Sequence, residues 1–276
     1  VLAPENIIVI GRTTLSRSTN EFIKLAKNLT VIDPRIADVD NNRQADLLVK
    51  SLPIDVVSES TSIDIWQKSS DLAAIEIKKL VWSEQAAIKC ICESLTSMSA
   101  LFVGSSRPVR DIEAFTKFQT GVFVFANRGL AGIDGNISTV FGIAKKYQVT
   151  NAIMGDLTFL HDISALTNSS KENLRIFVID NNGGGIFSTL PQAGSTGFEQ
   201  VFGTPHNLDL VKVISGFGVS VSRVSELAGL ELITKKPIKG FEVVVVQVPS
   251  REVNAQMLKE ITQRVSSAVR IGINLA

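Results

Sequence analysis

The feature that most limits the folds open to this chain is a repeated alternation between short apolar runs and longer amphipathic stretches. Such alternation is typical of parallel strands covered by helices. From residue 100 onward, apolar runs predict strands at 100–103, 122–125, 151–154, 175–179, 219–221 and 242–248. The stretches between them predict helices at 109–118, 137–147, 161–166, 208–217, 224–233 and 253–268. We therefore expect an α/β fold with a doubly wound, mostly parallel sheet.

The first part of the chain alternates less regularly. It predicts strands at 6–10 and 29–33, a helix at 18–28 and a polar surface loop at 34–46. A long helical region is expected over 65–95, which could be one interdomain helix followed by the first helix of a second unit. Polar residues cluster between 60 and 75, so we place a boundary there and expect a partial, Rossmann-like α/β domain over 1–68 and a second domain over 69–276.

Charge and composition argue against several classes of function. With 28 basic and 27 acidic residues the net charge is +1, so no field attracts a nucleic acid. No apolar run reaches the roughly 18 residues of a membrane span, and no secretory signal opens the sequence, so a cytoplasmic location is expected. Cys90 and Cys92 are too few for a structural zinc site, and His161 and His206 are too few for a histidine cluster.

Two loops that follow predicted strands carry polar residues together with glycines. Gly155 and Asp156 follow the strand at 151–154, and the segment 180–185 (DNNGGG) follows the strand at 175–179. Ligands bind at the carboxyl ends of such strands, so we expect the two loops to lie close together. Their carboxylate, carboxamide and carbonyl oxygens suit Mg²⁺ or Ca²⁺, with phosphate oxygens completing the shell. The alternative is a pair of tight turns that use Gly, Asp and Asn as capping residues.

A family resemblance rests on five strings that occur in order. They are FVGSSRPVRD (102–111), ANRGLAGIDG (126–135), GDLTFLHD (155–162), NGGGIFS (182–188) and FGTPH (202–206). Gly155 and Asp156, followed 25 positions later by Asn181, resemble the thiamine-diphosphate motif of decarboxylases and carboligases. The ordered set resembles the MenD family, the 2-succinyl-5-enolpyruvyl-6-hydroxy-3-cyclohexene-1-carboxylate synthases of menaquinone biosynthesis.

The resemblance implies roles for individual residues. Mg²⁺ (or Mn²⁺) would be held by Asp156, Asn181 and the main-chain oxygen of Gly183. Thiamine diphosphate would also contact Gly132, Ile133, Gly155, Leu157, Thr158 and Ile186. Substrate would contact Ser106, Arg110, Arg128, Ile186, Phe187, Leu190 and Arg12. Ile133, Arg128 and Arg110 would serve catalysis: Ile133 would support the bent cofactor, and the two arginines would hold substrate carboxylates.

Several of these residues also have a simpler interpretation. A surface salt bridge is the usual role of a single arginine, although the position of Arg128 in a glycine-rich loop argues against it. Ile133 could anchor its loop in the core, and Phe187 and Leu190 could be core residues. For the histidines, we expect His206 at a helix N-terminus and His161 near a helix start, capping it or touching diphosphate.

The resemblance also implies an activity, with 2-oxoglutarate and isochorismate as substrates. A transferase of this family decarboxylates 2-oxoglutarate and adds the succinyl unit to isochorismate. The first residues resemble the end of the family's middle domain, so the chain resembles the carboxyl-terminal half of such a synthase. We expect it to form a homo-oligomer, namely a homodimer. We also expect the chain to be inactive without a pyrimidine-binding domain. The alternatives are another thiamine-diphosphate decarboxylase or acetohydroxyacid-type synthase, and a non-catalytic subunit that retains the fold.

Overall fold

The computed structural model describes residues 4–11, 16–35, 44–52, 63–117, 120–168 and 171–273. The chain divides into two compact units, Val1–Asp71 with Val269–Ala276, and Leu72–Ala268. The first unit thus contains residues from both ends of the chain, whereas the expected first domain consists of residues 1–68 alone. The assignment of functional domains to these segments stays a prediction.

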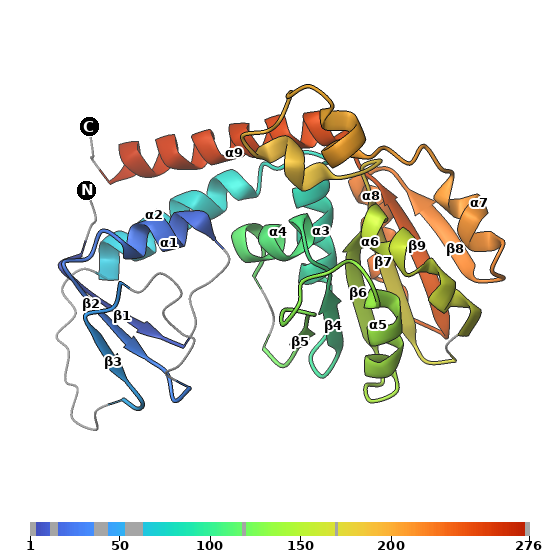
Figure 1. The fold of residues 1–276 in the computed structure, drawn as a ribbon, viewed down its shortest axis with the longest axis horizontal. Helices are drawn as coiled ribbons and strands as arrows, with labels where there is room; N and C mark the ends of the chain where they lie inside the picture. Colours follow the sequence, from blue (N-terminus) through green and yellow to red (C-terminus); the bar gives the residue numbers. More distant parts are fainter. Residues whose placement is uncertain are drawn as a thin grey trace. The chain divides into compact units, whose positions relative to one another are not determined.

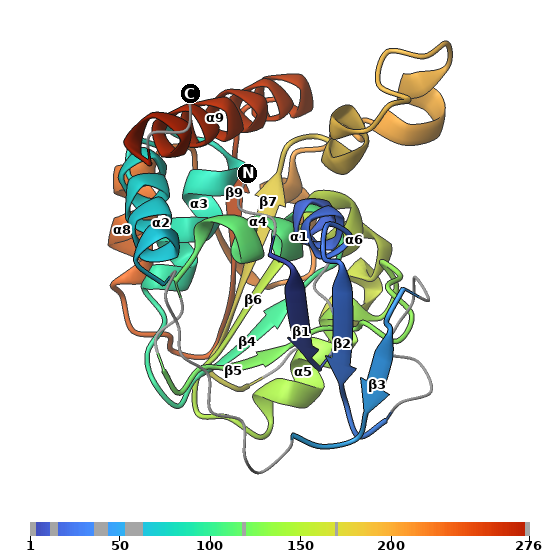
Figure 2. The same cartoon turned by 90° about the vertical axis from the view of Figure 1, so that its left-hand side faces the viewer.

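The first unit contains a small parallel sheet. Its strands are β1 (Asn6–Ile10), β2 (Asn28–Ile32) and β3 (Leu47–Val49), which pair in that order (Figure 2). Helix α1 (Arg17–Ile23) begins after Ser16, whose side chain accepts a hydrogen bond from the Thr19 N–H, and it ends earlier than expected. The third strand was missed because it is three residues long and follows a polar segment.

The second unit is built on a six-stranded sheet in which every pairing is parallel. The order is β5-β4-β6-β7-β9-β8 (Figure 1). The strands are β4 (Ala100–Val103), β5 (Phe123–Phe125), β6 (Thr150–Gly155), β7 (Leu174–Asp180), β8 (Ser220–Val224) and β9 (Phe241–Gln247). The six strands expected after residue 100 and their parallel arrangement are confirmed.

Helices cover both faces of this sheet. One face packs against α5 (Asn136–Ala144), α6 (Asp156–His161) and α7 (Leu210–Ser215). The other packs against α3 (Glu84–Glu93), α4 (Arg107–Phe115) and α8 (Leu227–Thr234). Within β7, Ile176 and Val178 face the first layer, whereas Phe177 and Ile179 face the second. Burial on both faces explains why the central strands are continuously apolar.

The helix boundaries differ from the expected ones in several places. The region 65–95 forms two helices, α2 (Ile63–Ile77) and α3, because the Ser83 hydroxyl accepts the Ala86 N–H and caps a new helix. Helix α6 begins at Asp156, five residues before the expected start, and a 3₁₀ turn follows it at Ile163–Asn168. The last helix is α9 (Arg251–Gly272). Among the described residues, no helix has both the length and the apolar content that a membrane crossing requires.

The course of the chain creates a crevice between β4 and β6. Helix α4, which follows β4, packs on one face of the sheet, and α6, which follows β6, packs on the other. The connections that leave these two neighbouring strands therefore diverge. Such a point of divergence is where doubly wound sheets bind ligands.

Candidate functional site

A cavity of about 390 Å³ lies at the carboxyl ends of β4, β5, β6 and β7. The residues predicted for the site that line it are Ser106, Arg110, Arg128, Ile133, Gly155, Asp156, Leu157, Thr158, Asn181, Gly183, Ile186 and Phe187. Gly132 and Leu190 are not among the lining residues. Arg12 lies outside the described residues. The structure thus gathers most of the predicted residues around one space, and their individual roles stay predictions.

Asp156 joins the two loops that were expected to meet. Its side chain is 2% exposed, and its Oδ1 atom accepts the Leu157 N–H at 2.6 Å. Its Oδ2 atom accepts the N–H of Gly183, from the loop after β7, at 2.8 Å. The proximity of the two loops is therefore confirmed.

The glycines of the second loop allow a close backbone contact. Gly183 has φ +135°, and a Cβ atom there would lie 2.2 Å from the carbonyl oxygen of Gly203. A Cβ at Gly184 would lie 2.2 Å from the Phe202 oxygen, and the Gly184 N–H donates to the Gly203 oxygen at 2.8 Å. A Cβ at Gly155 would meet no atom within 4 Å, so a ligand has room beside that residue. Side chains are thus excluded in one loop, and space is left at the other.

Asn181 has a buried oxygen that no described protein group satisfies. The residue is 7% exposed, and its Nδ2 atom donates to Oε2 of Glu84 at 3.4 Å. Its Oδ1 atom is buried, with no hydrogen-bond partner among the residues that the structure describes. An unsatisfied buried acceptor costs about 1–3 kcal/mol, which a bound cation would offset. The Asp156 carboxylate, this oxygen and the Gly183 carbonyl form a donor set that fits Mg²⁺.

Glu84 is a lining residue that the sequence did not indicate. It is 3% exposed at the start of α3, and its N–H donates to the Asn254 Oδ1 atom at 2.8 Å. Burial, aided by the nearby carboxylate of Asp111, raises the pKa of Glu84 to about 8. Burial also raises the pKa of Asp111 to about 6, against the opposing effect of its ion-pair partner Arg107.

His206 holds Asp156 from a third segment. Its Nδ1 atom accepts the Leu208 N–H at 3.0 Å, so in the neutral ring Nε2 carries the hydrogen. That atom lies 3.3 Å from Oδ2 of Asp156 and 3.5 Å from Oδ1 of Asp180. The hydrogen bond to Asp156 raises the pKa of His206. The geometry favours a role in orienting the carboxylate over one as a metal ligand.

These positions correct the expectations for both histidines. Helix α7 begins at Leu210, so His206 does not lie at its N-terminus. His161 is exposed at the carboxyl end of α6, so neither helix capping at the start nor contact with diphosphate is supported. Within the described ranges, Asp156, Asp180 and His206 form the one group of three acidic, cysteine or histidine residues whose ligand atoms lie within 4.8 Å of one another.

Two arginines line the cavity, Arg110 from helix α4, which follows β4, and Arg128 from the loop that follows the neighbouring strand β5. Arg110 donates to the Ser106 carbonyl oxygen at 2.7 Å, and Arg128 donates to the Ser105 hydroxyl at 3.2 Å. Arg128 is exposed and makes no ion pair with any residue that the structure describes, so the salt-bridge alternative has no support there. Guanidinium groups bind carboxylates through paired hydrogen bonds.

The apolar wall of the cavity is formed from two segments. Ile133 is 37% exposed and lines the cavity, so it does not anchor its loop in the core. Phe187 is half-buried, and its ring centroid lies 5.3 Å from that of Phe202. Leu190 is half-buried, and its N–H donates to the Phe187 carbonyl. The wall therefore combines the exposed aliphatic side chain of Ile133 with the ring of Phe187, which packs against Phe202.

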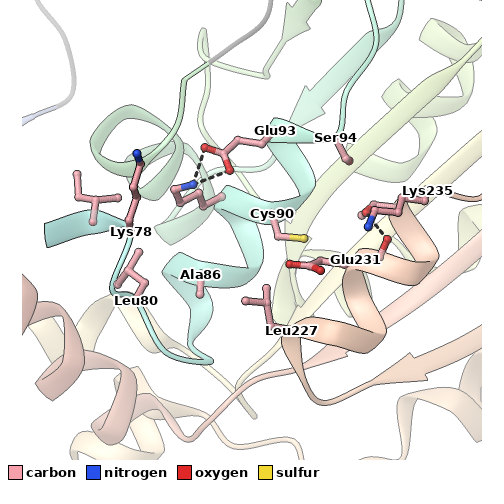
Figure 3. A pocket seen from close by; sticks show the side chains of 12 residues that line it. Lys78, Leu80, Ala86, Cys90, Glu93, Ser94, Leu227, Glu231 and Lys235 are labelled. Atoms are coloured by element: carbon pink, nitrogen blue, oxygen red, sulfur yellow. Dashed lines mark hydrogen bonds and ion pairs between the residues drawn. The ribbon is translucent and has the colours of Figure 1, made fainter. Parts of the chain in front are cut away.

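A second cavity, of about 510 Å³, lies between α3, α8 and the segment that follows α2 (Figure 3). None of the residues predicted for the site line it. The Cys90 side chain points toward Glu231 (Figure 3), and burial raises the pKa of the Cys90 thiol to about 11. Burial likewise raises the pKa of Cys92 to about 12, so neither thiol is activated as a nucleophile.

Comparisons with known proteins agree with this geometry. Residues 112–248 match the thiamine pyrophosphate enzyme, C-terminal TPP binding domain family. A 2-succinyl-5-enolpyruvyl-6-hydroxy-3-cyclohexene-1-carboxylate synthase of Thermobifida fusca is 31% identical over 97% of this chain and 50% of its own length. The synthase of the same name from Staphylococcus aureus is 34% identical over 74% of this chain and 39% of its own length.

The chain spans about half the length of the curated relatives that it matches. The matched domain runs from within α4 to just after β9, so it includes the loops after β5, β6 and β7 that line the cavity, whereas Glu84 and the lining residues between 105 and 110 lie outside it. Residues 112–248 therefore form the C-terminal TPP binding domain of a thiamine pyrophosphate enzyme, and the chain as a whole corresponds in sequence to the carboxyl-terminal half of the MenD-family synthases.

Proposed function

We propose that this chain provides the Mg²⁺- and diphosphate-binding half of a thiamine-diphosphate-dependent synthase. That synthase would decarboxylate 2-oxoglutarate and add the succinyl unit to isochorismate. The observation that carries the proposal is that one cavity is lined both by Asp156, Asn181 and Gly183 and by two arginines, Arg110 and Arg128. The relatives' name supports the same reaction.

Thiamine diphosphate, when bound, supplies the carbanion chemistry, and the protein supplies binding and orientation. Asp156, Asn181 and the Gly183 carbonyl would hold the cation that binds the diphosphate, with Gly155, Leu157 and Thr158 beside it. Their support is a buried carboxylate and an amide oxygen without a protein partner among the described residues.

On the other side of the cavity, Arg110 and Arg128 would fix the substrate carboxylates. Ile133, Ile186 and Phe187 would limit the water around the reacting atoms, because apolar side chains displace solvent from a closed site. The residues thus divide into a polar half for the cofactor and a mixed basic and apolar half for substrate.

A thermal-unfolding titration tests the cofactor part of this proposal. Mg²⁺ with thiamine diphosphate at about 100 times the dissociation constant adds about 2.7 kcal/mol of stability to the folded chain. We expect a clear rise in melting temperature with both ligands and none with the Asp156→Ala variant. No shift in the wild-type chain at millimolar thiamine diphosphate would favour a non-catalytic subunit.

The substrate part separates this synthase from other thiamine-diphosphate decarboxylases. Two arginines are suited to a dicarboxylic donor and an acceptor that carries carboxylates, whereas a small neutral acceptor needs no such pair. Turnover is expected only when a pyrimidine-binding domain completes the site, and the complete enzyme is expected to be a homo-oligomer. Turnover of pyruvate in preference to 2-oxoglutarate by that enzyme would support an acetohydroxyacid-type synthase.

A further inference from the structure

The first residue of α3, Glu84, contacts the predicted metal site without belonging to the predicted donor set. Ser83 caps the helix through the Ala86 N–H at 3.2 Å. The Glu84 N–H donates to Oδ1 of Asn254. The Nδ2 atom of Asn254 donates in turn to the carbonyl oxygens of Pro249 and Ser250. The start of α3 is therefore fixed by the Ser83 cap and by the hydrogen bond from the Glu84 N–H to Asn254.

The carboxyl group of Glu84 meets only one end of the Asn181 amide. Its Oε2 atom accepts from Nδ2 of Asn181, while Oδ1 of Asn181 has no partner among the described residues. Which end of a carboxamide faces which neighbour is decided by the hydrogen-bonding partners. A cation bound at the site would favour the ionised form of Glu84, and a carboxylate only accepts hydrogen bonds, so it pairs with the nitrogen end of the amide and not with the oxygen end. The neighbouring Gly185 leaves room for this arrangement, because a Cβ there would lie 2.4 Å from Nδ2.

We propose that Glu84 is a positioning residue that fixes the orientation of the Asn181 amide, so that its carbonyl oxygen is available to a divalent cation. This inference rests on the proposed function, since it assumes that Asn181 is a metal ligand. Without such a partner, either end of the amide would face the site, and an inverted amide would present hydrogens to the cation. Groups that orient metal ligands in this way commonly change metal affinity 10- to 100-fold when they are removed.

The first test measures Mn²⁺ binding to the chain by electron paramagnetic resonance with thiamine diphosphate in excess. Glu84→Gln is uncharged and nearly isosteric, and its amide can donate as well as accept, so it no longer selects one orientation of Asn181. We expect Mn²⁺ to bind this variant about tenfold more weakly. The matched control is Glu93→Gln, which removes an exposed carboxylate from the same helix and is expected to bind Mn²⁺ within about twofold of wild type.

An exchange of the two side chains separates orientation from simple structural support. Asn181→Asp alone places two carboxyl groups against each other and is expected to weaken binding about tenfold. In the double variant Glu84→Gln/Asn181→Asp, the glutamine amide donates to one oxygen of the aspartate and leaves the other for the cation. We expect the affinity of the double variant to return to within about threefold of wild type, whereas a purely structural role predicts that the two losses multiply.

Each outcome has a distinct consequence. A wild-type chain that binds no Mn²⁺ contradicts the proposed function and this inference together. Wild-type binding with an unchanged affinity in Glu84→Gln, or without recovery in the double variant, overturns the inference alone. The melting temperature of each variant, measured without metal, establishes that the folded chain is being compared.

Discussion

Replacing Gly183 by alanine is expected to destabilise the second unit strongly, because the loop after β7 packs directly against the backbone of residues 203 and 204. The new Cβ would lie 2.2 Å from the Gly203 oxygen, whereas real Cβ atoms essentially never approach within 3.0 Å. The two segments would have to separate by roughly 0.8 Å, which disturbs the hydrogen bond from the Gly184 N–H to the same oxygen.

Overpacking of this kind costs about 1–3 kcal/mol, and a side chain at φ +135° about 1–3 kcal/mol more. The expected loss of roughly 2–6 kcal/mol corresponds to a melting temperature lower by on the order of 10 °C for a unit of this size. Differential scanning calorimetry measures this change.

The matched control is Gly155→Ala. Gly155 has φ −73° and ψ 162°, which alanine adopts freely, and its Cβ would meet no protein atom within 4 Å. We expect its stability to stay within about 1 kcal/mol of wild type, while its affinity for Mg²⁺ and thiamine diphosphate falls because the methyl group fills space beside the ligand. A Gly183→Ala variant that melts within about 2 °C of wild type would refute the reasoning.

Three further predictions concern side chains around the cavity. His206→Gln keeps a hydrogen-bond donor near the position of Nε2, so its affinity for Mg²⁺, measured by calorimetry, is expected to equal that of wild type. His206→Asn is too short to supply that donor to Asp156 and is expected to bind Mg²⁺ about tenfold more weakly. Equal affinities of the two variants would count against the orienting role. In a complete enzyme, Arg128→Ala is expected to raise the KM for 2-oxoglutarate roughly tenfold or more, because it removes a charge-assisted hydrogen bond, and an unchanged KM in steady-state kinetics would contradict this role. Because the pKa of Glu84 is raised to about 8, the metal-free folded chain holds a proton between pH 4.5 and 8 that the unfolded chain releases, so stability should fall as pH rises through this range. Urea unfolding of Glu84→Gln should show a flatter pH profile, and a profile parallel to wild type would speak against it.

Local sequence patterns were sufficient for most of the fold. Short apolar runs between glycines and polar segments predicted the six strands of the main sheet, and the central strands gave the clearest signal because burial on both faces makes them continuously apolar. The strand Leu47–Val49 was not predicted, and the division of the region 65–95 into two helices was expected without a position for the break. The first is too short to give a periodic signal, and the second depends on the Ser83 cap, which local pattern does not separate from other serines.

The candidate site was predictable to the extent that its residues follow strands. Asp156, Asn181 and Gly183 come directly after β6 and β7, and parallel pairing of those strands requires their loops to meet. Glu84 and His206 could not be found in this way, since neither follows a strand of the sheet. Their contacts with Asn181 and Asp156 bridge 97 and 50 residues along the chain.

The sequence by itself therefore determined the elements, their parallel arrangement and the loops that carry the predicted oxygen ligands, because each depends on neighbouring residues and a short-range period. Only the tertiary structure decided which distant side chains contact Asp156 and Asn181. Glu84, at the start of α3, meets Asn181 because α3 packs on one face of the sheet, and His206 meets Asp156 because its segment folds back over the loop after β7. Hydrogen bonds between such distant residues depend on packing, to which no local pattern in the sequence corresponds.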